Sequence, residues 1–295
     1  MDIAQANGLH RLLVEELSRA GCFQRATPQA ARFGAFLLVA YFAAYGLLLA
    51  APRWPLRLLA IVAAALFSVQ AGFIAHQAGH GALTHDRRAA RWIGQLCHTL
   101  ASGLSASYFQ HIHRLHHPHC NDRGRDPDMQ SQFVSMYPQS AAAKRGIGGV
   151  ISRCQGWLVW LLIGLQGFTL KLDGLRFVRS RRQATRLDQA FLALHALVWL
   201  VAPSLVLGPG NALLNYALVT VAIGFYVGSI FMVNHIGTRV IEPGEALSHF
   251  EQELTVTRNL GDSRLADFLF GGVNNHIEHH LFPSMPTARR SSGDI

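Results

Sequence analysis

Residues 110–120 read QHIHRLHHPHC and hold five histidines between two apolar regions. Imidazole is neutral near pH 7, and its ring nitrogen is a good ligand for zinc, copper, iron or nickel. The core of this cluster is an H-x-x-H-H pattern, and two related patterns lie elsewhere in the chain. The three clusters are His113, His116 and His117; His276, His279 and His280; and His76 and His80. Their repetition predicts a shared metal site that the rest of the chain must bring together.

The composition indicates a membrane-embedded protein. Hydrophobic residues make up 50% of the 295 residues and charged residues only 15%, whereas a soluble domain usually has about 25% charged residues. The net charge is +9, but the basic residues flank apolar blocks and no nucleic-acid-binding signature is present. We therefore expect membrane lipid rather than nucleic acid as a partner. The four cysteines form no C-x-x-C pair, which favours reduced thiols.

Four apolar stretches are long enough to span a hydrocarbon core, which takes about 20 residues. We expect an all-α integral membrane protein with these spans in two hairpins: residues 33–51, 56–75, 190–207 and 212–233. Residues 92–107 and 147–170 are apolar but interrupted by polar side chains, which predicts helices in the membrane interface. Residues 1–32 predict an amphipathic segment, and residues 33–295 a single domain.

Basic residues predict the orientation of these spans. The hairpin tips hold two of the 26 Lys and Arg residues, whereas the segment between the hairpins holds fifteen, many of them in residues 171–186. Because basic loops stay in the cytoplasm, both termini and a cap formed by all three histidine clusters are expected there. The N-terminal sequence also lacks the basic and apolar regions of a signal peptide.

One more histidine joins the candidate ligands, since His235 follows the last predicted span directly. A metal such as zinc takes about four ligands, so nine imidazoles imply two metals. The type of ligand alone does not identify these metals. Asp126 and Asp128, in a DPD sequence after the central cluster, are candidates to hold ligating histidines in place. The other histidines are expected to be structural or merely near the site: His10, His85, His98, His111, His119, His195 and His249.

The sequences HQAGH, HRLHH and HIEHH, the last followed by Leu-Phe-Pro, resemble the three histidine boxes of membrane fatty acid desaturases. The resemblance covers about residues 30–286 and includes the DPD sequence, Asn234-His235 and Asn274-Asn275. It implies a non-haem di-iron centre and the use of O2 to introduce a double or triple bond into a fatty acyl chain linked to a lipid, to CoA or to acyl carrier protein. The ligands that it implies are His76, His80, His113, His116, His117, His235, His276, His279 and His280, with Asn234 and Asn275 as weaker candidates beside them.

Several alternatives stay open. The sequence contains no HPGG-type haem-binding segment, so a separate electron donor such as ferredoxin is expected. The NHIGT sequence at residues 234–238 also resembles bacterial acyl-carrier-protein desaturases and acetylenases. An acyl or carotenoid hydroxylase would use the same chemistry. A metal transporter would need ligands near the bilayer midplane, and a zinc hydrolase only about three ligands and a water.

Overall fold

The computed structural model describes residues 2–25, 27–130, 134–181, 185–261 and 263–289, so residues 182–184 of the predicted basic run lie outside it. Within the described ranges the chain is helical, and its one strand-like feature is an isolated bridge between Asp122 and Ile241. The prediction of an all-α protein is therefore confirmed.

The chain divides into two compact units. One, which we call the membrane unit, comprises Ala26–Gln110 and Ile163–Ser229; the other, the histidine unit, comprises Met1–Arg25, His111–Leu162 and Ile230–Ile295. Three helices continue from one unit into the other: α5 (Ala106–His116), α7 (Gly146–Ser180) and α10 (Pro209–His235). The assignment of residues 33–295 to one domain stays a prediction.

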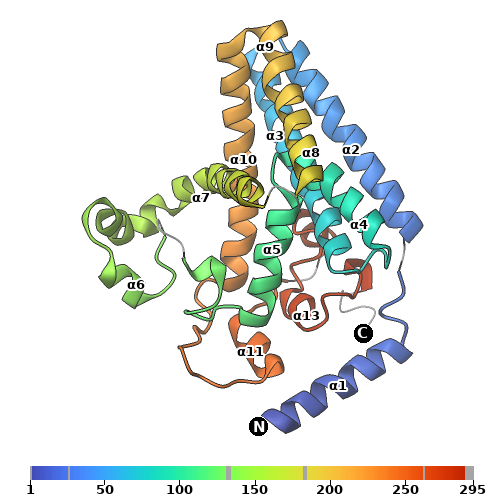
Figure 1. The fold of residues 1–295 in the computed structure, drawn as a ribbon, viewed down its shortest axis with the longest axis vertical. Helices are drawn as coiled ribbons and strands as arrows, with labels where there is room; N and C mark the ends of the chain where they lie inside the picture. The colour runs from blue at the N-terminus through green and yellow to red at the C-terminus, as the bar shows by residue number, and fades with distance from the viewer. Residues whose placement is uncertain (1, 26, 131–133, 182–184, 262, 290–295) are drawn as a thin grey trace. The chain divides into compact units, whose positions relative to one another are not determined.

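The remaining elements lie within one unit each (Figure 1). The membrane unit holds α2 (Thr27–Ala50), α3 (Trp54–Gly79), α4 (Arg87–Gly94), the π-helix η1 (Gln95–Leu100), α8 (Arg186–Ala196), the π-helix η4 (Leu197–Val201) and α9 (Ala202–Leu207). The histidine unit holds α1 (Ile3–Arg19), the 3-10 helices η2 (His117–His119), η3 (Pro127–Gln130) and η5 (Thr287–Arg289), α6 (Pro138–Ala143), α11 (His249–Val256), α12 (Arg264–Leu269) and α13 (His276–Leu281).

Among the described residues, five helical segments are long and apolar enough to cross a membrane. Four of them, α2, α3, the run from α8 to α9, and α10, contain the predicted spans. The fifth is α7, which extends over 35 residues and includes the stretch predicted to lie in the interface. Length and composition thus allow α7 either placement, and the count of four spans in two hairpins stays a prediction.

Small residues and hydrogen-bonded aromatic residues pack the helices of the membrane unit against one another. Ala60 and Ala64 of α3 are fully buried and let α2 and α3 run side by side (Figure 1). Tyr41 of α2 donates a hydrogen bond to the carbonyl of Ala101, and its hydroxyl accepts the indole N–H of Trp199. Buried polar groups in an apolar bundle need such partners, because an unpaired group there costs free energy.

The crossing of α7 and α10 depends on glycine. A Cβ added to Gly224 of α10 would lie far inside contact distance of the carbonyl oxygen of Gly164 and close to the backbone nitrogen of Gly167. The backbones of the two helices therefore touch directly, as at other membrane helix crossings lined by small residues.

A buried carboxylate fixes the start of α5, the helix that leads into the central histidine cluster. Asp188 of α8 is 2% exposed. It accepts hydrogen bonds from the backbone N–H of Ser107 at 3.0 Å, from the Ser107 hydroxyl at 2.7 Å and from Nε2 of Gln95 at 2.9 Å, and the Ser105 hydroxyl donates to it as well. Asp188 thus caps α5 from a distant segment of sequence, since a helix start leaves N–H groups without intrahelical partners.

In the histidine unit, α1 packs on the protein. Leu13 and Leu17 of α1 lie against a buried cluster that includes Phe250 of α11 and Phe282 just after α13. Asp2 caps the helix in a capping box with Gln5. The amphipathic pattern predicted for this segment is therefore used, at least in part, to cover the end of the third histidine cluster.

Candidate metal centre

Four imidazoles from three distant parts of the sequence meet inside the histidine unit. They belong to His116 at the end of α5, His235 at the end of α10, and His276 and His280 of α13. Ring centroids lie 4.9 Å apart for His116 and His235, 4.6 Å for His235 and His276, and 4.7 Å for His276 and His280. All four residues are buried. We call this set the second histidine group.

Each member of the second group has an acceptor beside its Nδ1 atom. Nδ1 of His116 lies 3.1 Å from Asp126, and Nδ1 of His280 lies 2.8 Å from Oε2 of Glu253. The other two face backbone carbonyls: His235 faces Val256 at 3.4 Å and His276 faces Val273 at 3.2 Å. An acceptor at Nδ1 favours the tautomer with the proton there and leaves the Nε2 lone pair for a metal.

The Nε2 atoms of the second group are buried and close to one another or without a partner. Those of His235 and His276 lie 2.8 Å apart, and that of His116 is buried without a hydrogen-bond partner. Both ring nitrogens of His280 are buried without a hydrogen-bond partner, since the contact of Nδ1 with Glu253 is close in distance but is not a hydrogen bond. A buried, unpaired nitrogen is unfavourable unless something binds it. Burial, together with the neighbouring imidazoles of His117 and His276, holds the pKa of His280 well below its ordinary value, which keeps the ring neutral as ligation requires. These residues fit a metal ion.

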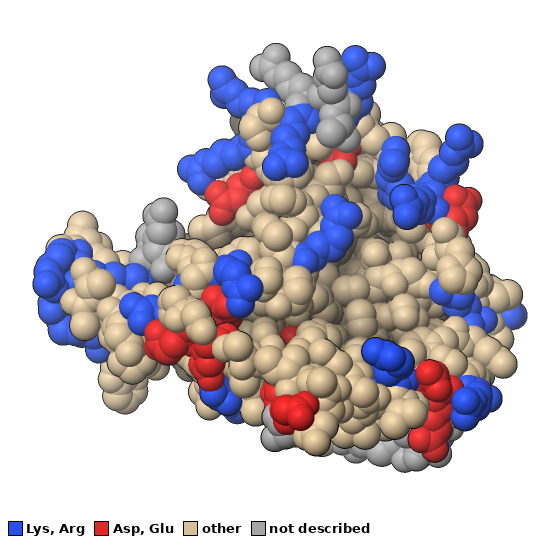
Figure 2. Space-filling view, turned by 60° about the horizontal axis from the view of Figure 1, so that its bottom comes forward, with Lys and Arg blue, Asp and Glu red and all other residues tan. Residues whose placement is uncertain are grey.

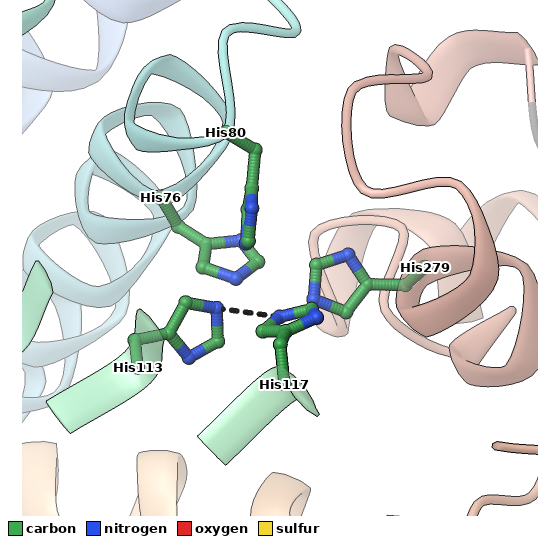
Figure 3. A group of neighbouring side chains, drawn as sticks. All are labelled: His76, His80, His113, His117 and His279. Atoms are coloured by element: carbon green, nitrogen blue, oxygen red, sulfur yellow. Dashed lines mark hydrogen bonds between the residues drawn. The ribbon is translucent and has the colours of Figure 1, made fainter. Parts of the chain in front are cut away.

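A first histidine group lies in the same unit. Nε2 of His117 is 2.9 Å from Nε2 of His113, the contact that Figure 3 marks with a dashed line. The ring of His279 lies 4.8 Å from that of His117, and one nitrogen of each of the three residues lies within 4.8 Å of the others. His113 and His117 meet because they are four positions apart at the end of α5, where side chains stack on one helix face.

The HQAGH pair belongs to the membrane unit. His76 and His80, also drawn in Figure 3, stand at the C-terminal end of α3 with ring centroids 4.8 Å apart. Their i, i+4 spacing thus puts both imidazoles together, as predicted.

The predicted supporting residues differ in their contacts. Asp126 is fully buried and holds His116, whereas the side chain of Asp128 is 50% exposed and its Oδ2 lies 3.4 Å from the same Nδ1. Asn234 is buried, with its side-chain nitrogen 3.3 Å from Nδ1 of His276. Asn275 precedes α13, and its carbonyl accepts the backbone N–H of His279.

Two residues beside the second group were not among the predicted site residues. Cys120 is fully buried with Sγ 3.3 Å from Nδ1 of His235, and burial raises the pKa of its thiol to about 12. Glu253 is fully buried, and burial raises its pKa to about 8. A periodic signal did exist for Glu253: with Phe250 and Val256 it occupies the buried face of α11 at three-residue spacing.

Two histidines set aside in the sequence lie apart from these groups. His195 contacts the carbonyl of Leu100 at 2.7 Å, as expected for a residue that joins neighbouring helices. His98 lies on the π-helix η1 against Phe109, with ring centroids 4.6 Å apart, and burial lowers its pKa to about 4.

Comparisons with known proteins agree with this geometry. The family model described as fatty acid desaturase matches residues 52–292. The chain is 25% identical to a delta(8)-fatty-acid desaturase of Borago officinalis over 94% of this chain and 65% of the relative. It is 27% identical to an acyl-lipid (8-3)-desaturase of Rebecca salina over 74% and 52%, and 26% identical to a delta 8-(E)-sphingolipid desaturase of Lachancea kluyveri over 72% and 41%. The chain thus spans between 41% and 65% of the length of these relatives. Because the family match extends over most of its residues, the chain belongs to the fatty acid desaturase family.

Proposed function

We propose that this chain is an O2-dependent oxidoreductase that introduces a double bond into a fatty acyl chain. The observation that carries the proposal is the second histidine group, in which four buried imidazoles have an acceptor at Nδ1 and turn Nε2 inward. The family match and the relatives, which are desaturases of acyl lipids and sphingolipids, support this reaction class.

Two iron ions are the proposed cofactor. The second group, His116, His235, His276 and His280, holds one iron, and the first group, His113, His117 and His279, holds the other together with His76 and His80. The i, i+4 pairing of the last two and the match of the family model to residues 52–292, which include the HQAGH sequence, support this completion. When bound, the irons supply the activation of O2 and the removal of hydrogen from an unactivated carbon chain.

The protein itself holds and orients the imidazoles and excludes water from this site. The Nδ1 acceptors hold the imidazoles in one tautomer and one ring orientation, so that ligand geometry does not have to form at the moment of binding. Burial of the second group excludes water from the reacting positions. The acyl chain is proposed to lie among the apolar helices, with its lipid, CoA or carrier-protein group at the surface.

The histidine groups and both termini are proposed to face the cytoplasm, as the distribution of basic residues favours. Figure 2 shows Lys and Arg side chains prominent on one face, with acidic side chains beside several of them. Such a surface suits anionic lipid and an acidic electron donor such as a ferredoxin. On α7, the exposure of Trp157 at 91% and of Trp160 at 55% supports a position of this part of the helix at the membrane interface.

Metal analysis tests the proposal. Protein purified in detergent from iron-57-grown cells is expected to contain two irons per chain with a Mössbauer signature of nitrogen-ligated non-haem iron. His116→Ala should lose at least one of them and should abolish new double bonds in the host's acyl lipids, measured by gas chromatography and mass spectrometry. Arg19→Ala, which removes a side chain that is 82% exposed and outside both groups, is the control. Two zinc ions after iron-replete expression, with no iron taken up on reconstitution, would overturn the oxidative mechanism in favour of hydrolysis.

A further inference from the structure

The short helix α11 carries none of the nine candidate ligands, yet it contacts three segments that build the second histidine group. Nε2 of Gln252 donates to the carbonyl of Cys120 at 3.1 Å, at the end of the central cluster. The carbonyl of Val256 lies 3.4 Å from Nδ1 of His235, and Oε2 of Glu253 lies 2.8 Å from Nδ1 of His280. One helix face of eight residues thus meets the α5 end, the α10 end and α13.

Glu253 is the one acidic side chain in this buried face of α11. Its side chain is 0% exposed and that of His280 is 1% exposed. Burying a carboxylate is costly unless a partner compensates for the lost water. An apolar residue would fill the same face of α11 without that cost, so the packing of the helix does not account for a glutamate here. The neighbour of this carboxylate is the imidazole of His280, whose Nδ1 lies 2.8 Å from Oε2 in an ion-pair contact without hydrogen-bond geometry.

The surroundings of His280 leave its ring little else to bind through Nδ1. On its other sides lie imidazoles: His117 is stacked at 4.3 Å between ring centroids, His116 lies at 5.2 Å and His276 at 4.7 Å. The second oxygen of Glu253 lies 3.5 Å from Nδ1 of His249, at the edge of the unit where the side chain of His249 is 39% exposed. The carboxylate is therefore held between two histidines of α11 and α13.

We propose that Glu253 is a positioning residue of the metal centre: through the 2.8 Å contact of its Oε2 with Nδ1 it keeps the ring of His280 in place and so aims Nε2 at the metal shared with His116, His235 and His276. This inference rests on the proposed di-iron function. Asp126 does the same for His116 from the other side of the group. The site then depends on α11, a segment outside all three histidine clusters.

Two substitutions of Glu253 distinguish the effect of its oxygen on the orientation of His280 from the effect of its negative charge. Glu253→Ala removes the acceptor, and the affinity for one of the two irons is expected to fall about 10- to 100-fold, the usual effect of losing such a partner. Glu253→Gln keeps an oxygen at the same place and is expected to keep both irons. The matched control is Glu251→Ala, which removes the capping glutamate of the same helix, whose carboxylate pairs with Ser248.

The readouts are iron per chain after titration with a graded chelator and the Mössbauer spectrum of the bound iron. The expected result is a wild type with two irons, a Glu253→Ala variant in which one iron is lost at lower chelator concentration, and Glu253→Gln and Glu251→Ala variants that resemble the wild type. If Glu253→Ala retains both irons with unchanged affinity and spectrum, the positioning role is overturned. It is also overturned if Glu253→Gln, or the control, loses iron as readily as Glu253→Ala.

Two further results are distinguishable from these. If Glu253→Ala fails to fold, the Glu253→Gln variant decides, because a folded Gln variant with full iron affinity supports the role of the acceptor oxygen and one with reduced affinity contradicts it. If the wild type itself binds no second metal, the proposed di-iron function fails, whatever the variants do.

Discussion

Both carboxylate oxygens of Asp126 lie 3.1 Å from Nδ1 of His116, and Asp126 also accepts the backbone N–H groups of Asn121 and Asp128. The carboxylate is therefore fixed by the loop after the central cluster, and it in turn fixes the imidazole. Asp126→Ala is expected to weaken metal binding at the second group by about 10- to 100-fold. Chelator competition measures this.

The neighbouring Asp128 provides the comparison for Asp126. Its side chain is 50% exposed and lies 3.4 Å from the same imidazole nitrogen, so Asp128→Ala should change metal affinity by less than about threefold, since exposed ionic contacts contribute little. If Asp126→Ala changes metal affinity as little as Asp128→Ala does, the DPD sequence acts only as a turn.

Substitution of Asp188 tests how the start of α5 is held within the membrane unit. Asp188→Ala would leave the buried donors of Ser105, Ser107 and Gln95 without their acceptor, and we expect a loss of about 2–4 kcal/mol in stability. Asp173→Ala, which removes an exposed ion pair with Arg176, should cost less than about 1 kcal/mol. Thermal unfolding in detergent compares the two variants, and similar melting temperatures would contradict the role of Asp188.

The glycine crossing of α7 and α10 predicts a steric effect. Gly224→Ala places a methyl group against the backbone of Gly164 and Gly167, so the helices must separate, at a cost of about 1–3 kcal/mol. Gly210→Ala on the same helix has open space around the added atom and serves as the control. The measurement is the melting temperature of each variant. No difference between the two would mean that the helices do not pack as closely as the structure places them.

Metal removal should destabilise the fold around the histidines. A ligand that binds only the native state stabilises it by about 2.7 kcal/mol when its concentration is 100 times its dissociation constant. Chelation is therefore expected to lower the melting temperature of the wild type, and to have a smaller effect on His116→Ala, in which a ligand of the second group is already lost. An equal shift in both proteins would argue against metal binding at that group.

The sequence alone predicted the family of this protein and most of its helices. Periodic spacing placed His76 and His80 on one helix face, and uninterrupted apolar runs predicted the membrane helices, because both depend only on local geometry and on hydrophobicity. The role of Asp126 was also predictable, since it lies ten residues after His116 and its sequence neighbours hold it in place.

Only the tertiary structure decided which residues distant in sequence support the histidines and the start of α5. Glu253 lies 27 positions before His280, and Asp188 lies 81 positions after Ser107, so no local pattern joins them. The division of the seven candidate ligands of the histidine unit into two groups likewise depends on how α5, α10 and α13 pack. Buried polar groups need polar partners, and these partners can come from any part of the fold. The spacing of residues along the sequence therefore does not predict these contacts.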